Sequence, residues 1–107
     1  MSDLHPLDKL FATALSRKGG DPASSYTAKL LSDGVEKCAK KLGEEAVETA
    51  LAAMTGDRKH IAAESADVLY HLSVLWAATG VSADDVYAEL KARESQSGLA
   101  EKASRKF

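Results

Sequence analysis

The fold is decided by a stretch that runs Glu64-Ser-Ala-Asp67-Val-Leu-Tyr-His-Leu-Ser-Val-Leu-Trp-Ala-Ala78. It opens with two acids three residues apart and then becomes almost wholly apolar. A three-residue step places both acids on one face of a helix, and a helix that is apolar on all sides is expected to be buried on all sides. The stretch therefore predicts a long central helix over about 58–79, ended by Gly80.

A second pair of acids, Glu45-x-x-Glu48, has the same spacing within another helical stretch over about 35–54. Two such helices side by side would aim four carboxylates at one point, where they repel each other. A hard divalent cation removes this repulsion, because Mg²⁺ and Mn²⁺ prefer oxygen ligands and accept several carboxylates. The two pairs predict a metal site made by Glu45, Glu48, Glu64 and Asp67.

The remaining chain predicts further helices with short polar breaks between them. Apolar residues at helical spacing over 4–15 stop at a loop over 17–22, and a short helix follows over about 26–32. Asp57 is a plausible N-cap for the central helix, and Ser82-Ala-Asp-Asp85 has the form of a capping box for a last helix reaching about residue 94. The tail over 95–107 is polar and basic, with one amphipathic run around 99–103. We expect one all-α domain over 1–107, because no hairpin, repeat or linker is present.

Length and charge limit what the chain can do. With 107 residues, one core is modest in size, and pairing with a second copy would help the protein to bury apolar surface. We therefore expect a homodimer whose two copies complete a four-helix core. A net charge of −2, from 14 basic and 16 acidic residues, argues against wrapping a nucleic acid.

The sequence also indicates the cellular compartment in which the protein works. A single cysteine, Cys38, excludes an internal disulfide, and it is most simply a small buried apolar residue. Neither a signal-peptide pattern nor the roughly 18 apolar residues of a membrane span is present. We expect a cytoplasmic protein without a membrane partner.

Each acidic pair has an ordinary alternative explanation. Lys41 lies four residues before Glu45, so the first pair could belong to a solvated charged face. Glu64 and Asp67 are harder to explain in this way, because they begin the apolar segment, where an unpaired carboxylate is expensive to bury. Gly43, within the helix, suggests the close approach of a ligand or of another backbone.

Other residues suggest contacts with a substrate. His71 shares a face with Asp67 and Glu64 and is a candidate contact, although a histidine on an apolar helix is more often a hydrogen-bonded core residue. The basic loop that contains Arg17 and Lys18, followed by Lys29 at the start of a helix, suits phosphate but lacks the P-loop pattern.

Other metal chemistries fit the sequence less well. One cysteine and three scattered histidines cannot make a structural zinc site, and H-E-x-x-H is missing. A di-iron bundle would use Glu-x-x-His on two helices. Ligation by oxygen alone favours magnesium.

The motif Glu44-Glu45-x-x-Glu48 followed by Glu64-x-x-Asp67 resembles that of the all-α nucleoside triphosphate pyrophosphohydrolases, the group of the MazG-type enzymes and dimeric dUTPases. Within this group, phosphoribosyl-ATP pyrophosphohydrolases of histidine biosynthesis are the most similar. Four segments carry that similarity: 25–30, 41–46, 64–71 and 97–104.

The resemblance implies a MazG-like helical bundle that hydrolyses phosphoribosyl-ATP to phosphoribosyl-AMP and pyrophosphate, the second step of L-histidine biosynthesis. Glu45, Glu48, Glu64 and Asp67 would hold Mg²⁺, or Mn²⁺, against the triphosphate, and Glu44 is the candidate that deprotonates or positions the attacking water. The candidate phosphate contacts are Lys41, Lys29 and Arg17. The extra phosphate of this substrate calls for basic residues away from the metal, for which the candidates are Arg17, Lys18, Lys29, Lys102 and Arg105.

Two alternatives stay open. One is a MazG-like house-cleaning enzyme that acts on another nucleotide. The other is a non-catalytic helical dimerisation module whose acids form a solvated face.

Overall fold

In the computed structural model, which describes residues 4–94, 98, 102–103 and 105, the chain is all-α. The described residues form five helices and no strand, which confirms the predicted fold class. The helices are α1 (Pro6–Ser16), α2 (Tyr26–Asp33), α3 (Val35–Thr55), α4 (Arg58–Thr79) and α5 (Ala83–Ala92). The tail predicted as a polar segment with an amphipathic run lies largely outside the described residues. None of the described helices is long and apolar enough to cross a membrane.

The helix boundaries follow from local capping. Asp57 accepts hydrogen bonds from the backbone N–H groups of Lys59 and His60, at 3.1 and 3.2 Å, and so caps α4 as predicted. The capping box of α5 is also present, with Ser82 and Asp85 each accepting from the other's backbone N–H. Gly56 and Gly80 end α3 and α4 in the left-handed conformation that glycine adopts without strain.

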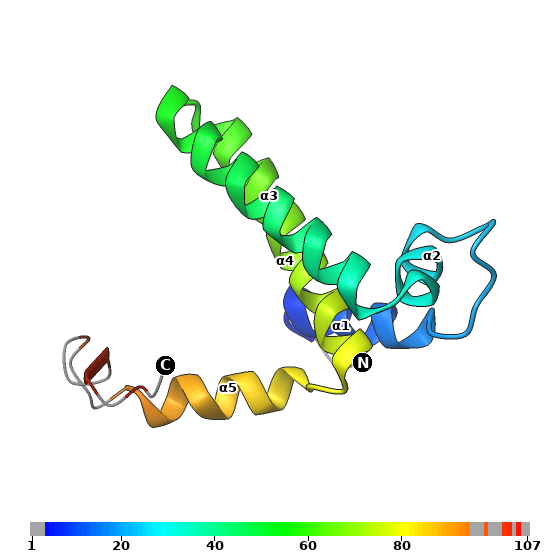
Figure 1. Ribbon diagram of the computed structural model, residues 1–107. Coiled ribbons are helices and arrows are strands. Elements are labelled where there is room, and N and C mark those ends of the chain that lie inside the picture. The colour runs from blue at the N-terminus through cyan, green and yellow to red at the C-terminus, as the bar shows by residue number, and fades with distance from the viewer. Residues whose placement is uncertain (1–3, 95–97, 99–101, 104, 106–107) are drawn as a thin grey trace.

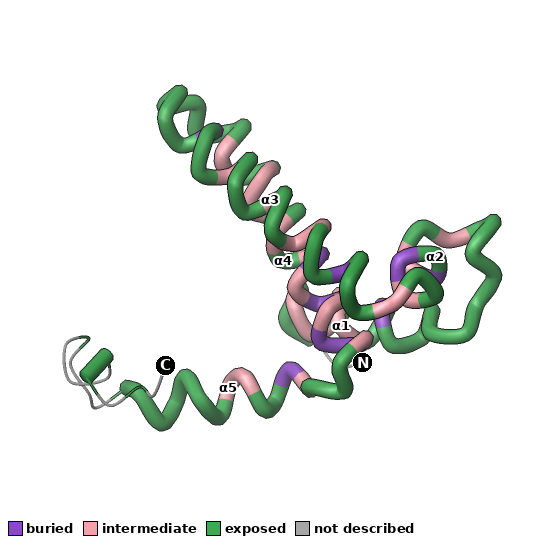
Figure 2. Tube along the Cα trace, in the orientation of Figure 1, coloured by how far each residue is buried: buried purple, intermediate pink, exposed green. Residues whose placement is uncertain are grey.

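Two long helices dominate the molecule. α3 and α4 form an antiparallel hairpin around the tight turn at Gly56, and α1 and α2 pack near the end of the hairpin that is far from this turn (Figure 1). The core lies at the same end, where Ala14, Leu30, Cys38, Val74 and Ala77 are buried together. Burial is accordingly dense there and sparse toward the turn (Figure 2).

Long-range hydrogen bonds between described residues attach the loop between α1 and α2 to α4, and α5 to α1. The ammonium group of Lys18 donates to the carbonyl of Ala77 at 3.1 Å, which holds the loop against the last turns of α4. The hydroxyl of Tyr87 donates to Asp8 Oδ1 at 2.8 Å and joins α5 to α1. α5 otherwise packs hardly at all on the other four helices and runs away from the hairpin (Figure 1).

One expectation about burial is met only in part within a single chain. Val74, Trp76 and Ala77 in the second half of α4 are buried, whereas Leu69, earlier in the helix, is 44% exposed. On α3, a row of apolar side chains faces outward at Val47, Leu51 and Met54. The reason is geometric: one hairpin covers one side of each of its helices, and α1 and α2 reach only one end of it.

Candidate functional site

The packing seam between α3 and α4 contains the candidate acids. On α3, the less exposed positions recur at alternating steps of four and three residues, as in a coiled coil. These positions are Cys38, Leu42, Glu45, Thr49 and Ala52. On α4 the corresponding positions are Ile61, Glu64, Val68, His71 and Leu75. Glu45 and Glu64 thus occupy places where helix packing alone would favour apolar side chains.

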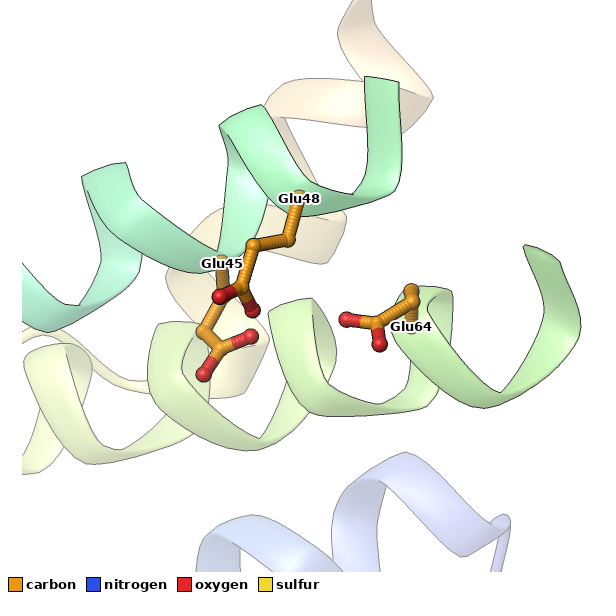
Figure 3. Close-up of side chains that lie close together, drawn as sticks. All are labelled: Glu45, Glu48 and Glu64. Atoms are coloured by element: carbon orange, nitrogen blue, oxygen red, sulfur yellow. The ribbon is translucent and has the colours of Figure 1, made fainter. Parts of the chain in front are cut away.

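Three carboxylates meet across this seam. Glu45 and Glu48 extend from α3, and Glu64 extends toward them from α4 (Figure 3). One oxygen from each of the three lies within 4.8 Å of the others. The two pairs of acids predicted from their spacing are therefore brought together, at least through these three members.

The electrostatics of the cluster are unfavourable without a counter-charge. A shared hydrogen bond with Glu48 raises the pKa of the Glu45 carboxyl, and partial burial and the negative charges of Glu48, Asp67 and Glu64 add to the effect. One oxygen of Glu45 and one of Glu64 are buried without a hydrogen-bond partner among the described residues. Buried, unpartnered carboxylate oxygens at this spacing are donors that suit a hard divalent cation.

Asp67 lies at the edge of this cluster. It is exposed and does not belong to the group of three, although its charge is close enough to contribute to the raised pKa of Glu45. Its position, one turn along α4 from Glu64, leaves its carboxylate available to a ligand shared with the other acids.

Glu44 points away from the seam and pairs with a lysine. Its Oε1 lies 3.3 Å from the Nζ of Lys41, and the Glu44 side chain is 49% exposed. The solvated-face explanation predicted a Lys41–Glu45 pair, but Lys41 pairs with Glu44 instead. Glu45, whose side chain is only 16% exposed, remains in the seam.

His71 is buried, as expected for a core residue, but the expected hydrogen bonds are missing. Its Nδ1 has no hydrogen-bond partner among the described residues, and its Nε2 lies 3.9 Å from Glu45 Oε1, beyond hydrogen-bond distance. Burial, assisted by the nearby charge of Lys41, lowers the pKa of His71 and so favours the neutral ring. The burial expected of a core histidine is therefore confirmed, whereas the described residues supply no hydrogen bond to Nδ1. A contact of His71 with the substrate stays a prediction.

The predicted phosphate contacts are dispersed. Lys29 and Lys41 lie on α2 and α3, and both line a pocket of about 170 Å³ between these helices. Arg17 is the C-cap of α1, and no described contact joins it to the acids. Lys18 is occupied by its hydrogen bond to Ala77.

Two residues near the acids were not identified from the sequence. The hydroxyl of Thr49 lies 2.9 Å from the carbonyl of Glu45 and 3.1 Å from that of Glu64, so it bridges the two helices beside the acids. The ring of Tyr26 on α2 meets the ring of His71 edge-on, with 6.3 Å between the centroids. Thr49 does lie one turn after Glu45 in the seam pattern, but the contact of Tyr26 depends on how α2 docks, which no local pattern encodes.

Known proteins are similar to this chain over nearly its whole length. Residues 7–94 match the family described as phosphoribosyl-ATP pyrophosphohydrolase. The chain is 58% identical to a phosphoribosyl-ATP pyrophosphatase of Parvibaculum lavamentivorans, over 97% of this chain and 95% of that protein. It is 59% identical to one of Jannaschia sp., over 94% and 98%, and 60% identical to one of Methylobacterium radiotolerans, over 95% of each. The chain therefore belongs to the phosphoribosyl-ATP pyrophosphohydrolase family.

Proposed function

We propose that this protein hydrolyses phosphoribosyl-ATP to phosphoribosyl-AMP and pyrophosphate, the second step of L-histidine biosynthesis. Membership of the family and high identity over nearly the whole chain support the choice of reaction. The main observation behind the proposal is that the carboxylates of Glu45, Glu48 and Glu64 meet, and that two of their oxygens are buried without a hydrogen-bond partner in the described part of the chain.

The donor set suits Mg²⁺, with Mn²⁺ as the nearest substitute. All donors are carboxylate oxygens from Glu45, Glu48 and Glu64, and we add Asp67 as a fourth ligand. When bound, such an ion offsets the charge of a triphosphate and lowers the pKa of a water molecule.

The other side chains have separate roles in the proposal. Glu44, exposed next to Glu45, is our candidate to accept a proton from the attacking water, and its pairing with Lys41 orients its carboxylate. Lys41, Lys29 and Arg17 contact phosphate groups, as lysine and arginine side chains do elsewhere. His71, neutral and buried against Tyr26, offers a ring nitrogen to the substrate and helps to exclude water.

We also propose that the protein acts as a homodimer. Val47, Leu51 and Met54 are 60%, 63% and 85% exposed, and they lie on one side of α3. Gly43 continues this row toward the start of α3, and a Cβ atom built there would meet none of the described residues within 4 Å. A second hairpin packed on this side would complete a four-helix core. Cys38, a free buried thiol, suits the reducing cytoplasm, where we place the reaction.

The proposed function is tested by turnover of three substrates: phosphoribosyl-ATP, ATP and dUTP, each with and without Mg²⁺. Pyrophosphate release is measured as phosphate after addition of a pyrophosphatase. We expect turnover of phosphoribosyl-ATP that requires Mg²⁺ and exceeds that of the other two. A preference for another nucleotide would favour the house-cleaning alternative, and no release from any nucleotide would favour a non-catalytic helical module.

A further inference from the structure

A pocket of about 170 Å³ lies between α2 and α3, beside the acidic cluster. Its lining comes from one face of each helix: Tyr26, Lys29, Leu30 and Asp33 on α2, and Lys37 and Lys41 on α3. The spacing of these residues, at three- and four-residue steps, explains why they face one another. The pocket is therefore built by the docking of α2 on α3.

The charge of the pocket is positive. Three lysines and one aspartate line it, and two of the lysines already have anionic partners. Lys29 lies 3.3 Å from Asp33, and Lys41 lies 3.3 Å from Glu44. Lys37 forms no ion pair within the described part of the chain, so its ammonium group is free to meet a ligand.

The pocket and the acids are adjacent. Lys41 lies one helical turn before Glu45 on α3, and Lys37 lies two turns before it, about 12 Å along the helix axis. Tyr26 also touches His71 edge-on, and His71 in turn lies beside Glu45. A ligand that occupies the acidic cluster with one end can therefore place its other end in the pocket.

We propose that the α2–α3 pocket binds the phosphorylated ribose that distinguishes phosphoribosyl-ATP from ATP. This inference rests on the proposed function and assigns Lys37, a residue that the sequence did not single out, as the main contact for that phosphate. Lys29 and the hydroxyl of Tyr26 are the supporting donors. A phosphate monoester gains charge-assisted hydrogen bonds from these groups.

Asp33 explains why a phosphorylated sugar suits the α2–α3 pocket better than inorganic phosphate does. The carboxylate of Asp33 repels an anion but accepts hydrogen bonds from sugar hydroxyls. A ligand with one dianionic end and adjacent hydroxyl groups matches both kinds of lining residue.

The first test is binding of ribose 5-phosphate to the full chain in EDTA, followed by NMR or calorimetry. Lys37→Gln is compared with Lys40→Gln, an exposed neighbour on α3 that does not line the pocket. We expect the wild type and Lys40→Gln to bind equally and Lys37→Gln to bind about 10- to 100-fold more weakly, as for the loss of a hydrogen bond between charged groups. Equal binding by both variants would overturn the assignment of Lys37.

Separate probes distinguish the sugar from the phosphate. Ribose 5-phosphate should bind more tightly than inorganic phosphate, and Asp33→Asn should reduce this preference because the amide no longer offers two acceptor oxygens to the hydroxyls. If inorganic phosphate binds as tightly as ribose 5-phosphate, the pocket does not recognise the sugar, and the proposal fails.

The second test is kinetic. For Lys37→Gln, the ratio of kcat/KM for phosphoribosyl-ATP to kcat/KM for ATP should fall about 10- to 100-fold, mainly through KM, while Lys40→Gln keeps the ratio. An equal loss with both substrates would mean that the pocket serves the triphosphate, which overturns the proposal. A wild type that does not hydrolyse phosphoribosyl-ATP would instead refute the proposed function, and the binding test, which needs neither metal nor turnover, still decides the pocket.

Discussion

Glu45 occupies a seam position where an apolar side chain would pack better, and it does so among three other acids. Its raised pKa shows that the folded chain resists the charge there, with the shared hydrogen bond to Glu48 as the largest cause. A side chain that opposes packing in this way is typical of a functional site, where stability is given up for chemistry.

Glu45→Gln is expected to raise the melting temperature in EDTA, because the neutral amide keeps the shape and removes repulsion from Glu48 and Glu64. It should also abolish the increase in melting temperature caused by Mg²⁺ and reduce turnover at least about 100-fold. Thermal unfolding with and without Mg²⁺ measures the first two effects. Glu94→Gln, an exposed change of the same kind, is the control, and stabilisation by Mg²⁺ equal to that of the wild type would count against the site.

Thr49 provides a second prediction, which concerns stability alone. Thr49→Val keeps the side-chain shape but leaves the carbonyl of Glu64 without its contact from α3. The free energy of unfolding should fall by about 1 kcal/mol, the usual net value of one hydrogen bond. Thr79→Val is the matched control, because the hydrogen bonds that its hydroxyl forms with described residues all lie within α4. Equal losses in both variants would show that the bridge between the helices contributes nothing.

The acids could be predicted from the sequence because their partners are set by helical spacing, which is local. Lys37 and Tyr26 could not, since their importance comes from the docking of α2 on α3. His71 was correctly placed on the face of the acids, but its missing hydrogen bonds depend on which atoms of α3 lie opposite. At the residue scale, the sequence therefore predicts which side chains share a helix face, but not which residues of other helices they contact.

At the scale of elements, the ends of the helices were predictable to within about two residues because the caps are local chemistry. Asp57 and Ser82 each begin a helix, and Gly80 ends one, where the sequence indicated. The division of α3 into two apolar rows was not predictable. One row, with Cys38 and Ala52, faces α4, while the other, with Val47 and Leu51, faces outward.

The attachment of α5 to α1 is predicted to depend on pH. The hydrogen bond to Asp8 raises the pKa of Tyr87, with burial and the charge of Asp8 as further causes, so the folded chain favours the protonated phenol. This contribution to stability is complete below a pH of about 10, the pKa of an unperturbed tyrosine, and is lost as the pH rises through the raised value.

In an absorbance titration of the three tyrosines, Asp8→Asn should therefore bring one high pKa down toward its ordinary value. Tyr87→Phe should remove the high pKa from the titration curve. The free energy of unfolding of this variant should also fall less steeply at high pH, because the hydrogen bond to Asp8 is already absent. An unchanged titration curve for Asp8→Asn would show that Tyr87 and Asp8 do not interact in solution.

At the scale of the whole molecule, the acidic cluster and the exposed apolar row lie on different sides of the α3–α4 hairpin. The acids lie in the seam between α3 and α4, whereas Val47, Leu51 and Met54 face outward from α3. A row of exposed leucine and methionine side chains on one side of a helix is unfavourable in water. The cost in free energy is roughly 25 cal/mol per Å² of exposed apolar area. A second copy of the chain supplies the same row and can cover it by twofold symmetry.

Leu51→Gln is the decisive variant for this arrangement, because Leu51 is 63% exposed in the single chain and lies in the middle of the row. If the row is the dimer interface, the polar side chain would be buried against the partner, and the dissociation constant should rise at least about 10-fold. Leu15→Gln, an exposed leucine on α1, is the control. Sedimentation velocity at several concentrations measures the change. A wild type that sediments as a monomer at micromolar concentration and is still active would refute the dimer. A Leu51→Gln variant that associates as tightly as the wild type would place the interface elsewhere.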